Sequence, residues 1–263
     1  MQVYISVVSH HHYNIIESLD CLNKLAKSFH VIVKSNIPDI QLKHYCQNND
    51  LVYLENINKK GFGENNNDNF EYCIKELDMQ PDDLFIILNP DIIISENSIF
   101  ELIKVMTDRN IEFATINLYR DKEHTEFDPS IRKFPTLIDF VSSYIGFGNK
   151  TIIDKTKILD VCDVDWSAGS FLALRVKLYE TVGGFSRRYF MYCEDIDICM
   201  RLGYEGYQLF YIPYIKATHL ARQNNRKIMS KHFFWHLKSM LMYLWEKRKY
   251  ATKKSINNNY KVY

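Results

Sequence analysis

The first hundred residues alternate short apolar runs with segments of helical periodicity. The runs are rich in β-branched residues, as buried parallel strands are, and they lie at Val3–Ser9, Phe29–Ser35, Leu51–Asn56 and Leu84–Ile94. Between them, apolar residues recur three and four positions apart, which indicates amphipathic helices. One such segment spans Ile15 to Leu25, and another spans Asn69 to Leu77, after a turn-rich stretch. This alternation predicts an α/β fold with a mostly parallel central sheet flanked by helices.

The overall composition suits a large globular domain. The chain has 263 residues, of which 46% are hydrophobic and 25% charged, so it can bury an ample core. Its net charge of +1 gives no general attraction to nucleic acid or to membranes. Basic residues gather in the C-terminal tail and not along a face with base-stacking positions, so we do not expect nucleic-acid binding.

The six cysteines are scattered without C-x-x-C spacing, so the sequence indicates neither a zinc site nor a disulfide framework. Free thiols of this kind fit a reducing cytoplasm. The N-terminal stretch MQVYISVVSHHH has no basic leader and no small-residue cleavage site, so we expect no signal peptide. A run of about 18 apolar residues is absent, and we therefore expect no transmembrane helix.

Several polar residues directly follow the predicted strands. In a doubly wound sheet, ligands bind at the carboxyl ends of the strands, where the connecting loops gather. Ser9, Asn36, the loop that begins at Gly61, and Asp91 all fall at such ends. We therefore expect these residues to converge on one crevice.

The strongest strand, LFIILNPDIII, is interrupted at Asn89-Pro90-Asp91, because proline cannot donate to a ladder. Asp91 is thus a candidate ligand for a divalent cation, Mg²⁺ or Mn²⁺, that bridges the phosphates of a nucleotide. The structural alternative is an Asx-turn that ends the strand. His219, at the end of the strand-like run Leu209–His219, is either a second ligand or a hydrogen-bonded histidine.

Two further stretches each have a functional and a structural interpretation. The stretch GFGENNND, which begins at Gly61, either brings backbone amides close to a phosphate or a sugar, or forms a surface turn. It lacks the lysine of a P-loop and the complete dinucleotide fingerprint. Trp166 with Gly169 offers either a flat wall for a sugar or a part of the core.

The stretch YFMYCEDIDICMRLG crowds three carboxylates beside aromatic residues. Apolar spacing predicts a helix from Glu194 to Gly203, in which Asp197 and Arg201 are four apart and can pair along one face. The helix dipole and this pairing account for Asp197 and Arg201. They leave Glu194 and Asp195 unexplained, and a carboxylate held at a helix start beside apolar walls is a candidate general base.

The second half of the chain is less regular. Phe113–Tyr119 reads as a further central strand, and the stretch from Trp166 to Phe185 as a strand, a short helix and a Gly-Gly turn. For residues 120–160 no element is predicted, and a loop over the crevice is one arrangement. His232–Lys254 alternates bulky apolar and basic residues at helical spacing, which suits a helix at an anionic membrane surface or a helix packed on the core or on another subunit.

Five segments, taken in order, resemble a family 2 glycosyltransferase of the GT-A fold, within the rhamnosyltransferase-like branch that builds bacterial surface polysaccharides. They cover about residues 3–220 and are VVSHHHYN, NKKGFGENNN, LNPDIII, WSAGSFLALR and GGFSRRYFMYCEDIDICMRLGYEGYQLFYIPYIKATH. The resemblance implies a Rossmann-like GT-A domain over residues 1–225 and a basic, aromatic helical extension over residues 226–263.

The resemblance also implies roles for individual residues. Asp91 matches the metal-binding acid of an Asp-x-Asp-like motif, and His219 matches a histidine that helps to hold the metal. Asp195 matches the catalytic base, and Glu194 is the neighbour that tunes or orients it. Contacts to the nucleotide are implied for Ser9, Asn36, Gly61, Asn66, Asn89 and Asp91, and contacts to the acceptor for Trp166 and Gly169.

These observations together predict an inverting, metal-dependent glycosyltransferase that moves L-rhamnose from dTDP-rhamnose onto a glycan or lipid-linked acceptor in O-antigen or capsule-type synthesis. We expect a polyprenyl diphosphate to carry the acceptor. The enzyme is then cytoplasmic, and it is peripheral on the inner face of the bacterial cell membrane if its tail docks there. Rival donors are UDP-galactofuranose, UDP-galactose and UDP-N-acetylglucosamine, and the rival outside enzymes is a non-catalytic sugar-nucleotide-binding subunit of a polysaccharide assembly complex.

Overall fold

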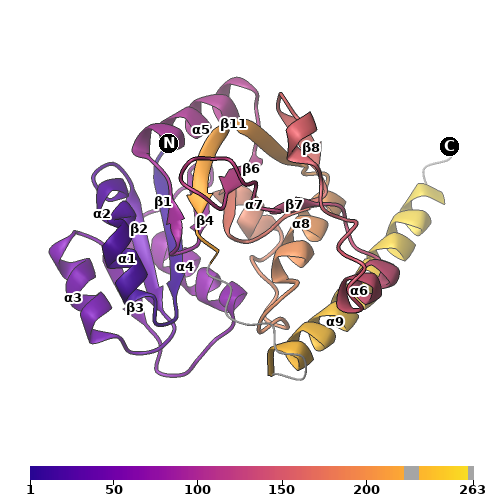
Figure 1. Cartoon of the computed structure of the whole chain (residues 1–263), viewed down its shortest axis with the longest axis horizontal. Helices are drawn as coiled ribbons and strands as arrows, with labels where there is room; N and C mark the ends of the chain where they lie inside the picture. The colour runs from indigo at the N-terminus through magenta and orange to yellow at the C-terminus, as the bar shows by residue number, and fades with distance from the viewer. Residues whose placement is uncertain (222–230, 260–263) are drawn as a thin grey trace.

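A central sheet of nine strands organises the part of the chain that the computed structural model describes, which is residues 1–221 and 231–259 (Figure 1). The strand order is β3-β2-β1-β4-β10-β6-β11-β5, and β8 pairs with β11. The strands are β1 (Val3–Ser9), β2 (His30–Ser35), β3 (Val52–Glu55), β4 (Leu84–Leu88), β5 (Ile92–Ile93), β6 (Phe113–Tyr119), β8 (Cys162–Val164), β10 (Phe171–Arg175) and β11 (Leu209–His219). A separate two-stranded sheet joins β7 (Ile131–Arg132) to β9 (Trp166–Ser167).

The direction of the strands changes in the middle of the sheet. The strands β3, β2, β1 and β4 are parallel to one another, as the sequence predicts. β10 then runs antiparallel between β4 and β6, because it enters the sheet beside the carboxyl end of β4, where Phe171 pairs with Leu88. The predicted α/β class is confirmed, and the sheet is mixed beyond β4.

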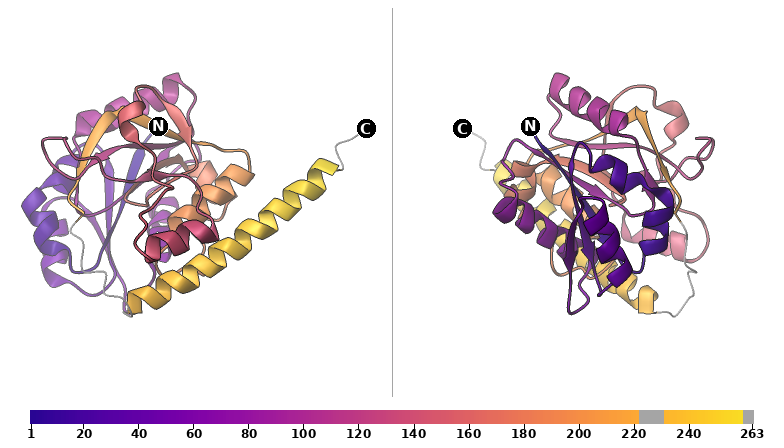
Figure 2. Two further views of the ribbon diagram at one scale, coloured as in Figure 1. Left: turned by 45° about the vertical axis from the view of Figure 1, so that its right-hand side comes forward. Right: turned by 90° about the vertical axis from the view of Figure 1, so that its left-hand side faces the viewer.

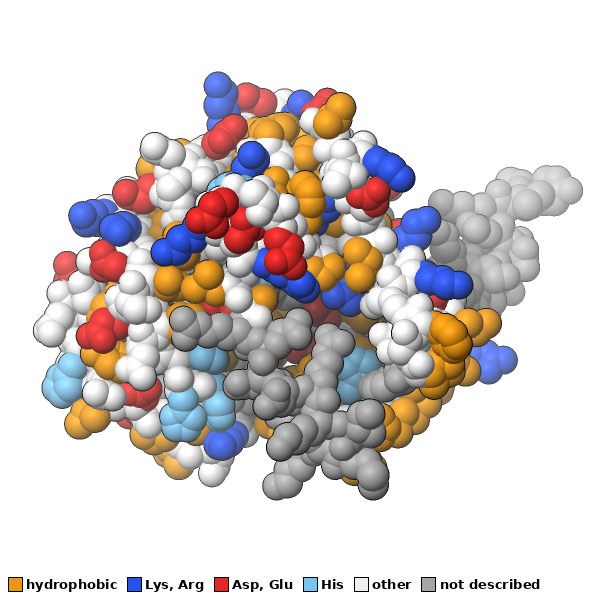
Figure 3. Space-filling view, viewed as in Figure 1, with side chains coloured by type: hydrophobic (Ala, Val, Ile, Leu, Met, Phe, Trp, Pro, Cys, Tyr) orange, Lys and Arg blue, Asp and Glu red, His pale blue; other side chains and the backbone are white. Residues whose placement is uncertain are grey.

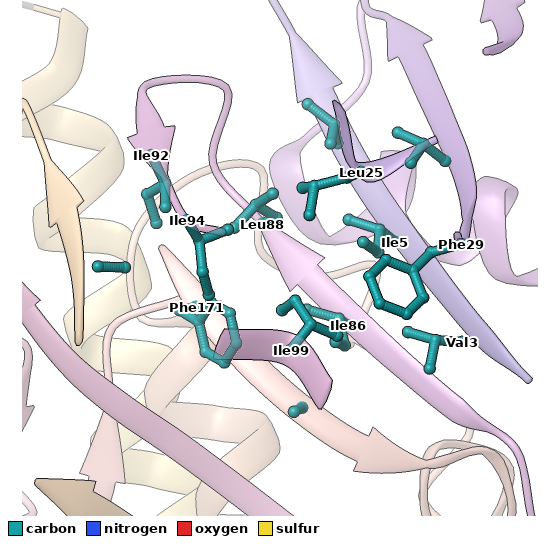
Figure 4. Close-up of a cluster of buried hydrophobic side chains, with 14 of the residues drawn as sticks. Val3, Ile5, Leu25, Phe29, Ile86, Leu88, Ile92, Ile94, Ile99 and Phe171 are labelled. Atoms are coloured by element: carbon teal, nitrogen blue, oxygen red, sulfur yellow. The ribbon is translucent and has the colours of Figure 1, made fainter. Parts of the chain in front are cut away.

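Helices cover both faces of the sheet (Figures 1 and 2). One face is packed by α1 (Tyr13–Leu19), α2 (Cys21–Leu25), α3 (Ile40–Asn48) and α5 (Glu96–Asp108), whose apolar side chains meet those of β1 and β4 (Figure 4). The other face is packed by α4 (Phe62–Glu76), α7 (Val176–Thr181) and α8 (Glu194–Tyr204). The central strands are buried on both faces, which explains their nearly continuous apolar sequences.

The helix α4 begins earlier than the sequence predicts. We expected a helix only from Asn69, after a turn-rich stretch, but the chain is helical from Phe62, with Gly61 as the N-cap. Asparagine usually opposes helices because its amide competes for backbone groups. Here the buried amides of Asn65 and Asn66 donate to the carbonyls of Gly61 and Phe62, at 2.8 and 3.0 Å, within the helix itself. Because these amides are buried and bond within the helix, a segment with the composition of a turn is helical here.

Other elements also differ from the expectation. The single helix predicted after the first strand is divided into α1 and α2, because Asp20 adopts a left-handed conformation with φ of 51°. Residues 120–160, for which no element was predicted, hold β7, α6 (Leu137–Tyr144) and a 3-10 turn, η1 (Lys155–Lys157). A capping box of Thr136 and Asp139 starts α6.

The helix α9 (Lys231–Asn259) runs along α8 and projects beyond the two layers (Figure 2). Met240 and Tyr243 are buried in the core cluster of α8, and the Ser239 hydroxyl donates to the Met191 carbonyl at 2.9 Å. Part of this helix therefore packs on the core, which is one of the arrangements expected. The expected domain boundary at residue 225 lies outside the described residues. None of the helices in the described part is both long and apolar enough to cross a bilayer.

Two glycine-to-alanine substitutions should change stability in opposite directions. A Cβ at Gly63, in α4, would lie 2.6 Å from Cβ of the buried Phe185, whereas a Cβ at Gly203, in α8, meets no atom within 4 Å. We expect Gly63→Ala to lower the free energy of unfolding by about 1–3 kcal/mol through overpacking. Gly203→Ala should raise it by about 0.5–1 kcal/mol through helix propensity. Urea unfolding measures both changes, and a stabilised Gly63→Ala variant would contradict the close contact.

Candidate functional site

The junction between β4 and β10 brings distant parts of the chain together. Just beyond their last paired residues, the N–H of Asn89 donates to the carbonyl of Ser170 at 2.9 Å. Gly169 and Ser170 therefore lie against the residues that precede Asp91. One of the glycines singled out in the sequence and the acid at the strand break thus meet at the carboxyl edge of the sheet.

His219, at the end of β11, lies between two carboxylates. Its Nε2 is 3.4 Å from Oδ1 of Asp91, and its Nδ1 is 3.1 Å from Oδ2 of Asp128. The backbone fixes Asp91 in this position, because β5 pairs with β11 and the N–H of Leu220 donates to the Asp91 carbonyl at 3.1 Å. Asp91 and His219 are therefore held side by side.

The charges of these groups reinforce the arrangement. Burial lowers the pKa of His219, but hydrogen bonds to Asp128 and Asp91 outweigh the burial and raise this pKa to about 9. Burial raises the pKa of Asp91, but the hydrogen bond and the charge of His219 outweigh it and hold this pKa below its usual value. Without a bound cation, an imidazolium therefore lies between two carboxylates at neutral pH, and a metal ion that bound Nε2 would displace the proton of that nitrogen.

Asp128 is a residue of this site that the sequence did not reveal. It is buried, and behind it the buried Lys155 donates from Nζ to the Ser130 hydroxyl at 2.9 Å. A carboxylate that accepts from Nδ1 of a histidine fixes the imidazole tautomer and leaves Nε2 for a ligand. The sequence signal at this position is an Asp-Pro dipeptide, which reads as an ordinary turn.

Asp195, in the first turn of α8, lies against Gly169. Its Oδ2 accepts a hydrogen bond from the N–H of Gly169 at 3.2 Å, and its Oδ1 accepts one from the N–H of Ile196 at 2.9 Å. A Cβ at position 169 would lie 3.1 Å from the ring of Phe62 and 3.6 Å from Cβ of Asp195. The absence of a side chain at Gly169 therefore allows α8 to bring a partly buried carboxylate against the strand junction.

Glu194 has different surroundings from its neighbour Asp195. It is 7% exposed, and its Oε2 has no hydrogen-bond partner among the described residues. Burial and the charge of Asp195 raise the pKa of Glu194 to about 8. Burial also raises the pKa of Asp195, although the hydrogen bond from Gly169 opposes this shift. The pair therefore retains a proton into the neutral range, as groups that transfer protons often do.

The third carboxylate, Asp197, has the structural role that the sequence predicts. It is buried, and its Oδ2 accepts a hydrogen bond from Nε of Arg201 at 2.7 Å. Arg201 also donates to the carbonyls of Val182 and Gly184, at 2.7 and 2.8 Å. The predicted pair is confirmed, and it joins α8 to the Gly-Gly turn after α7.

Ser9, Asn36 and Gly61 meet where β1 and β2 end and α4 begins. The N–H of Asn36 donates to the Ser9 carbonyl at 2.8 Å, and the Asn36 side chain makes two hydrogen bonds of 2.9 Å with the backbone of Lys60. Gly61 follows directly and approaches the carbonyl of Phe190, which leaves no room for a Cβ. Three of the four features predicted to converge therefore lie together, namely Ser9, Asn36 and the loop at Gly61.

Two predicted site residues lie in the interior, behind the crevice. Asn66 is completely buried, and its Oδ1 accepts from the Ser6 hydroxyl at 2.7 Å. Trp166 is 5% exposed, its indole N–H donates to the Lys133 carbonyl at 2.9 Å, and Arg132 lies 5.4 Å from the centre of its ring. Contrary to the expectation of direct contacts, neither side chain has an open face for a ligand, because each is satisfied within the protein.

The face of the molecule drawn in Figure 3 is hollowed near its centre, with acidic side chains inside the hollow and histidines beside it. Within residues 1–221 and 231–259, no group of three or more His, Cys, Asp and Glu side chains is arranged to hold a metal ion. Asp91 and His219 supply two donor atoms 3.4 Å apart. Two such donors fit Mg²⁺ or Mn²⁺, which bind one or two protein side chains and complete their shell with phosphate oxygens and water.

Comparison with known proteins identifies the family of this chain. A model of the family described as Glycosyl transferase family group 2 matches residues 84–251. Rhamnosyltransferase WbbL of Escherichia coli (strain K12) is 41% identical over 248 residues, which are 94% of this chain and 94% of that protein. The chain belongs to glycosyltransferase family 2.

This family 2 glycosyltransferase has further relatives. The N-acetylglucosaminyl-diphospho-decaprenol L-rhamnosyltransferase of Mycobacterium tuberculosis is 30% identical over 170 residues, 62% of this chain and 55% of that protein. The solved structure of GalNAc-T7 with UDP, GalNAc and Mn²⁺ has a TM-score of 0.58 at 12% identity, over 83% of this chain and 44% of that one. Staphylococcus aureus TarS has a TM-score of 0.55 at 12% identity, over 83% and 36%. These likenesses confirm the expected GT-A fold, and the family confirms the enzyme class.

Replacing Glu194 with Gln should make the stability of this glycosyltransferase less dependent on pH. The pKa of a Glu side chain is 4.5 in its unperturbed state and about 8 at this position. Between these values the unfolded chain has released a proton that the folded chain keeps, so stability falls as the pH rises through this window. The Glu194→Gln variant has no such fall, and its melting temperature should rise relative to the wild type as pH increases.

Thermal melts across this pH window measure the difference. Glu76→Gln, at an exposed position near the end of α4, is the matched control and should follow the wild type. If the Glu194→Gln curve also ran parallel to the wild type, Glu194 would not carry the retained proton.

Proposed function

We propose that this chain is an inverting, metal-dependent rhamnosyltransferase that transfers L-rhamnose from dTDP-L-rhamnose to a lipid-linked glycan in O-antigen or capsule-type polysaccharide synthesis. One observation carries the proposal. The junction at Asn89 and Ser170 has Asp195 on one side and the pair of Asp91 and His219 on the other. Inverting transfer needs these two groups in one crevice, namely a base for the acceptor hydroxyl and a site that stabilises the leaving diphosphate.

The relatives suggest the sugar and the acceptor. Similarity to rhamnosyltransferase WbbL over almost the whole chain favours rhamnose as the transferred sugar. The mycobacterial relative is named for an N-acetylglucosaminyl-diphospho-decaprenol acceptor. This name favours a polyprenyl diphosphate that carries N-acetylglucosamine as the acceptor here.

Asp195 is the catalytic base of the proposed reaction. Its carboxylate takes the proton of the acceptor hydroxyl while the hydroxyl oxygen forms a bond to the anomeric carbon. The bond from that carbon to the diphosphate breaks, and its electron pair leaves with dTDP. Because the attack comes from the face opposite the nucleotide, a β-linked donor gives an α-linked product. The hydrogen bond from Gly169 orients Asp195, and the raised pKa of Glu194 keeps a second negative charge from developing beside it.

Asp91 and His219 are the residues that would hold Mg²⁺ or Mn²⁺ together with diphosphate oxygens. When bound, the ion supplies Lewis-acid stabilisation to the departing diphosphate. Asp128 keeps Nε2 of His219 directed toward Asp91, through its contact with Nδ1. The amide of Asn89, with Nδ2 3.5 Å from Nε2 of His219, lies beside the same group.

The remaining predicted residues divide between the two substrates. Ser9, Asn36 and Gly61 form the nucleotide side, where strand ends and the start of α4 present backbone groups to the base and the ribose. Gly169 forms part of the acceptor side. Trp166 supports that side from the interior, because it is buried three residues before Gly169 and its indole N–H is held by the Lys133 carbonyl.

The alternatives have less support. A UDP-sugar donor, such as UDP-galactofuranose, UDP-galactose or UDP-N-acetylglucosamine, agrees with the UDP in the GalNAc-T7 structure, but a 12% identity shows the fold alone. A non-catalytic subunit that only binds sugar nucleotides is disfavoured, because the chain belongs to a glycosyltransferase family and has both acids at the junction.

A polyprenyl-linked acceptor is anchored in a membrane, so the proposed enzyme must act at the membrane surface. We place the enzyme in the cytoplasm, in peripheral contact with the inner face of the bacterial cell membrane. The basic, aromatic C-terminal helix is the element that the sequence suggests for this contact.

Removal of the proposed base should abolish transfer and leave donor binding intact. Asp195→Asn keeps the size of the side chain but cannot take the proton, so we expect kcat to fall by about 10²–10⁴-fold. The change in melting temperature caused by dTDP-rhamnose should stay near the wild-type value. Asp163→Asn, at an exposed position of β8, is the matched control and should keep full activity. Turnover near the wild-type rate in Asp195→Asn would refute the assignment.

Substitutions around His219 should weaken metal-dependent donor binding. Because a ligand that binds the folded state stabilises it, dTDP-rhamnose should raise the wild-type melting temperature more with Mn²⁺ than without it. We expect Asp91→Asn to remove the Mn²⁺-dependent part, and Asp128→Asn to weaken the apparent affinity for Mn²⁺ about 10–100-fold. Asp160→Asn, whose side chain is 71% exposed, is the control. The same screen with UDP-sugars tests the identity of the donor. If a UDP-sugar raised the melting temperature and dTDP-rhamnose did not, dTDP-rhamnose would be excluded as the donor.

A further inference from the structure

The helix α6 exposes apolar side chains that the protein leaves uncovered. Ile138 is 76% exposed, and Phe147, just after the helix, is 75% exposed. Leu137, Val141 and Ile145 are exposed as well. Phe140 is the buried member of this segment, and its ring packs 6.1 Å from the ring of Tyr243 in α9. α6 is therefore anchored by one side chain and presents an apolar surface outward.

The helix α9 adds a second exposed stripe, in which apolar and basic residues alternate. Phe234, Lys238, Leu241, Trp245 and Lys249 are all exposed and are spaced four, three, four and four apart, so they share one side of the helix. Nζ of Lys249 lies 3.2 Å from the centre of the Trp245 ring. The opposite side of α9 packs on the core through Met240 and Tyr243. Half of the large exposed apolar side chains in the described part of the chain lie on α6, the turn after it, and α9.

Acidic groups on these two helices are engaged within the protein. Asp139, in α6, belongs to the capping box with Thr136. Glu246, in α9, pairs with Arg188. The charged side chains on the exposed stripe of α9 are those of the two bases Lys238 and Lys249. The surface is therefore apolar and positively charged, a combination that suits anionic lipid.

This surface adjoins the acceptor side of the site. The loop that leads into α6 is tied to the neighbourhood of Trp166, because the N–H of Phe134 donates to Asp165 at 2.7 Å. The Pro135 carbonyl, one residue on, accepts from the Tyr243 hydroxyl at 3.2 Å and so joins the loop to α9. Figure 3 shows hydrophobic side chains gathered at the lower right of the molecule, over α6 and along α9.

We propose that α6 and α9 together form the surface that docks on an anionic bilayer, with the side chains of Ile138 and Phe147 inserted among the lipids. The proposal extends the membrane contact from the C-terminal helix to α6, which lies beside the acceptor side. It rests on the proposed function in one respect, the lipid-linked acceptor. A protein partner fits less well, because lysine is depleted at the centre of protein interfaces. A bilayer accommodates both parts, since lysine side chains extend to the headgroups.

Vesicle co-sedimentation of the full chain, without donor or acceptor, tests the proposal. We expect binding to vesicles of phosphatidylglycerol and phosphatidylethanolamine, weakening as salt is raised, and little binding to pure phosphatidylcholine. The double variant Ile138→Asp/Phe147→Asp should lose at least about tenfold in affinity for the anionic vesicles. The matched control is Ile40→Asp/Leu159→Asp, at positions that are 70% and 88% exposed on other elements, and it should bind like the wild type.

Equal loss of vesicle binding in both double variants, or no binding by the wild type, would overturn the proposal. A second outcome would also overturn it: the wild type is a dimer by size-exclusion light scattering, and Ile138→Asp/Phe147→Asp makes it a monomer without changing its vesicle binding. The substituted positions are exposed, so we expect the variants to fold. Far-UV circular dichroism spectra equal to that of the wild type check this. Donor-induced stabilisation is measured in the same samples, so a wild type that fails to bind vesicles but keeps its donor shift would refute the surface alone.

Discussion

The antiparallel entry of β10 beside β4 is the constraint on which the site depends. A strand that starts at the carboxyl edge of its neighbour must bring the preceding loop to that edge, and the bond between Asn89 and Ser170 closes this contact at 2.9 Å. The N–H of Gly169 then donates a hydrogen bond to Asp195, and the lack of a side chain at Gly169 lets α8 approach this loop. In the proposed enzyme, the parallel half of the sheet would supply the strand ends for the nucleotide, and the reversed strand would supply the opposite wall.

The two acids at this junction are placed in contrasting surroundings. Asp91 lies beside a positively charged histidine, which lowers its pKa and suits a group that stays ionised. Burial raises the pKa values of Asp195 and Glu194, and the charge of Asp195 raises that of Glu194 further, which suits groups that exchange a proton. A buried Glu194 whose Oε2 has no hydrogen-bond partner in the described part of the chain is costly for folding. Its retention in the first turn of α8 is the kind of local conflict between stability and chemistry that active sites show.

Apolar patterning was sufficient to locate the long strands of the central sheet, because these are buried on both faces, whereas the short, half-buried β8 was not predicted. Residues 3–9, 113–119 and 209–219 were predicted with the bounds that β1, β6 and β11 have. The pairing of Asp197 with Arg201 also followed from spacing alone. What failed depended on tertiary burial: the asparagines of α4, the enclosure of Asn66 and Trp166, and the approach of Asp128 to His219. Asn66, Trp166 and Asp128 have partners far away in the chain, which no local pattern encodes. The amides of α4 bond within their own helix, where they are buried, and their burial is not visible in the local sequence either.

The short ladder between β5 and β11 has a further consequence. It pairs Ile92 with His219, so the separation of Asp91 from the imidazole is set by backbone geometry and not by the loops around them. Those loops can be lengthened or exchanged while the distance between the two side chains stays the same. In the proposed enzyme, a scaffold of this kind would hold the metal-binding pair in place independently of the loops that contact the sugar.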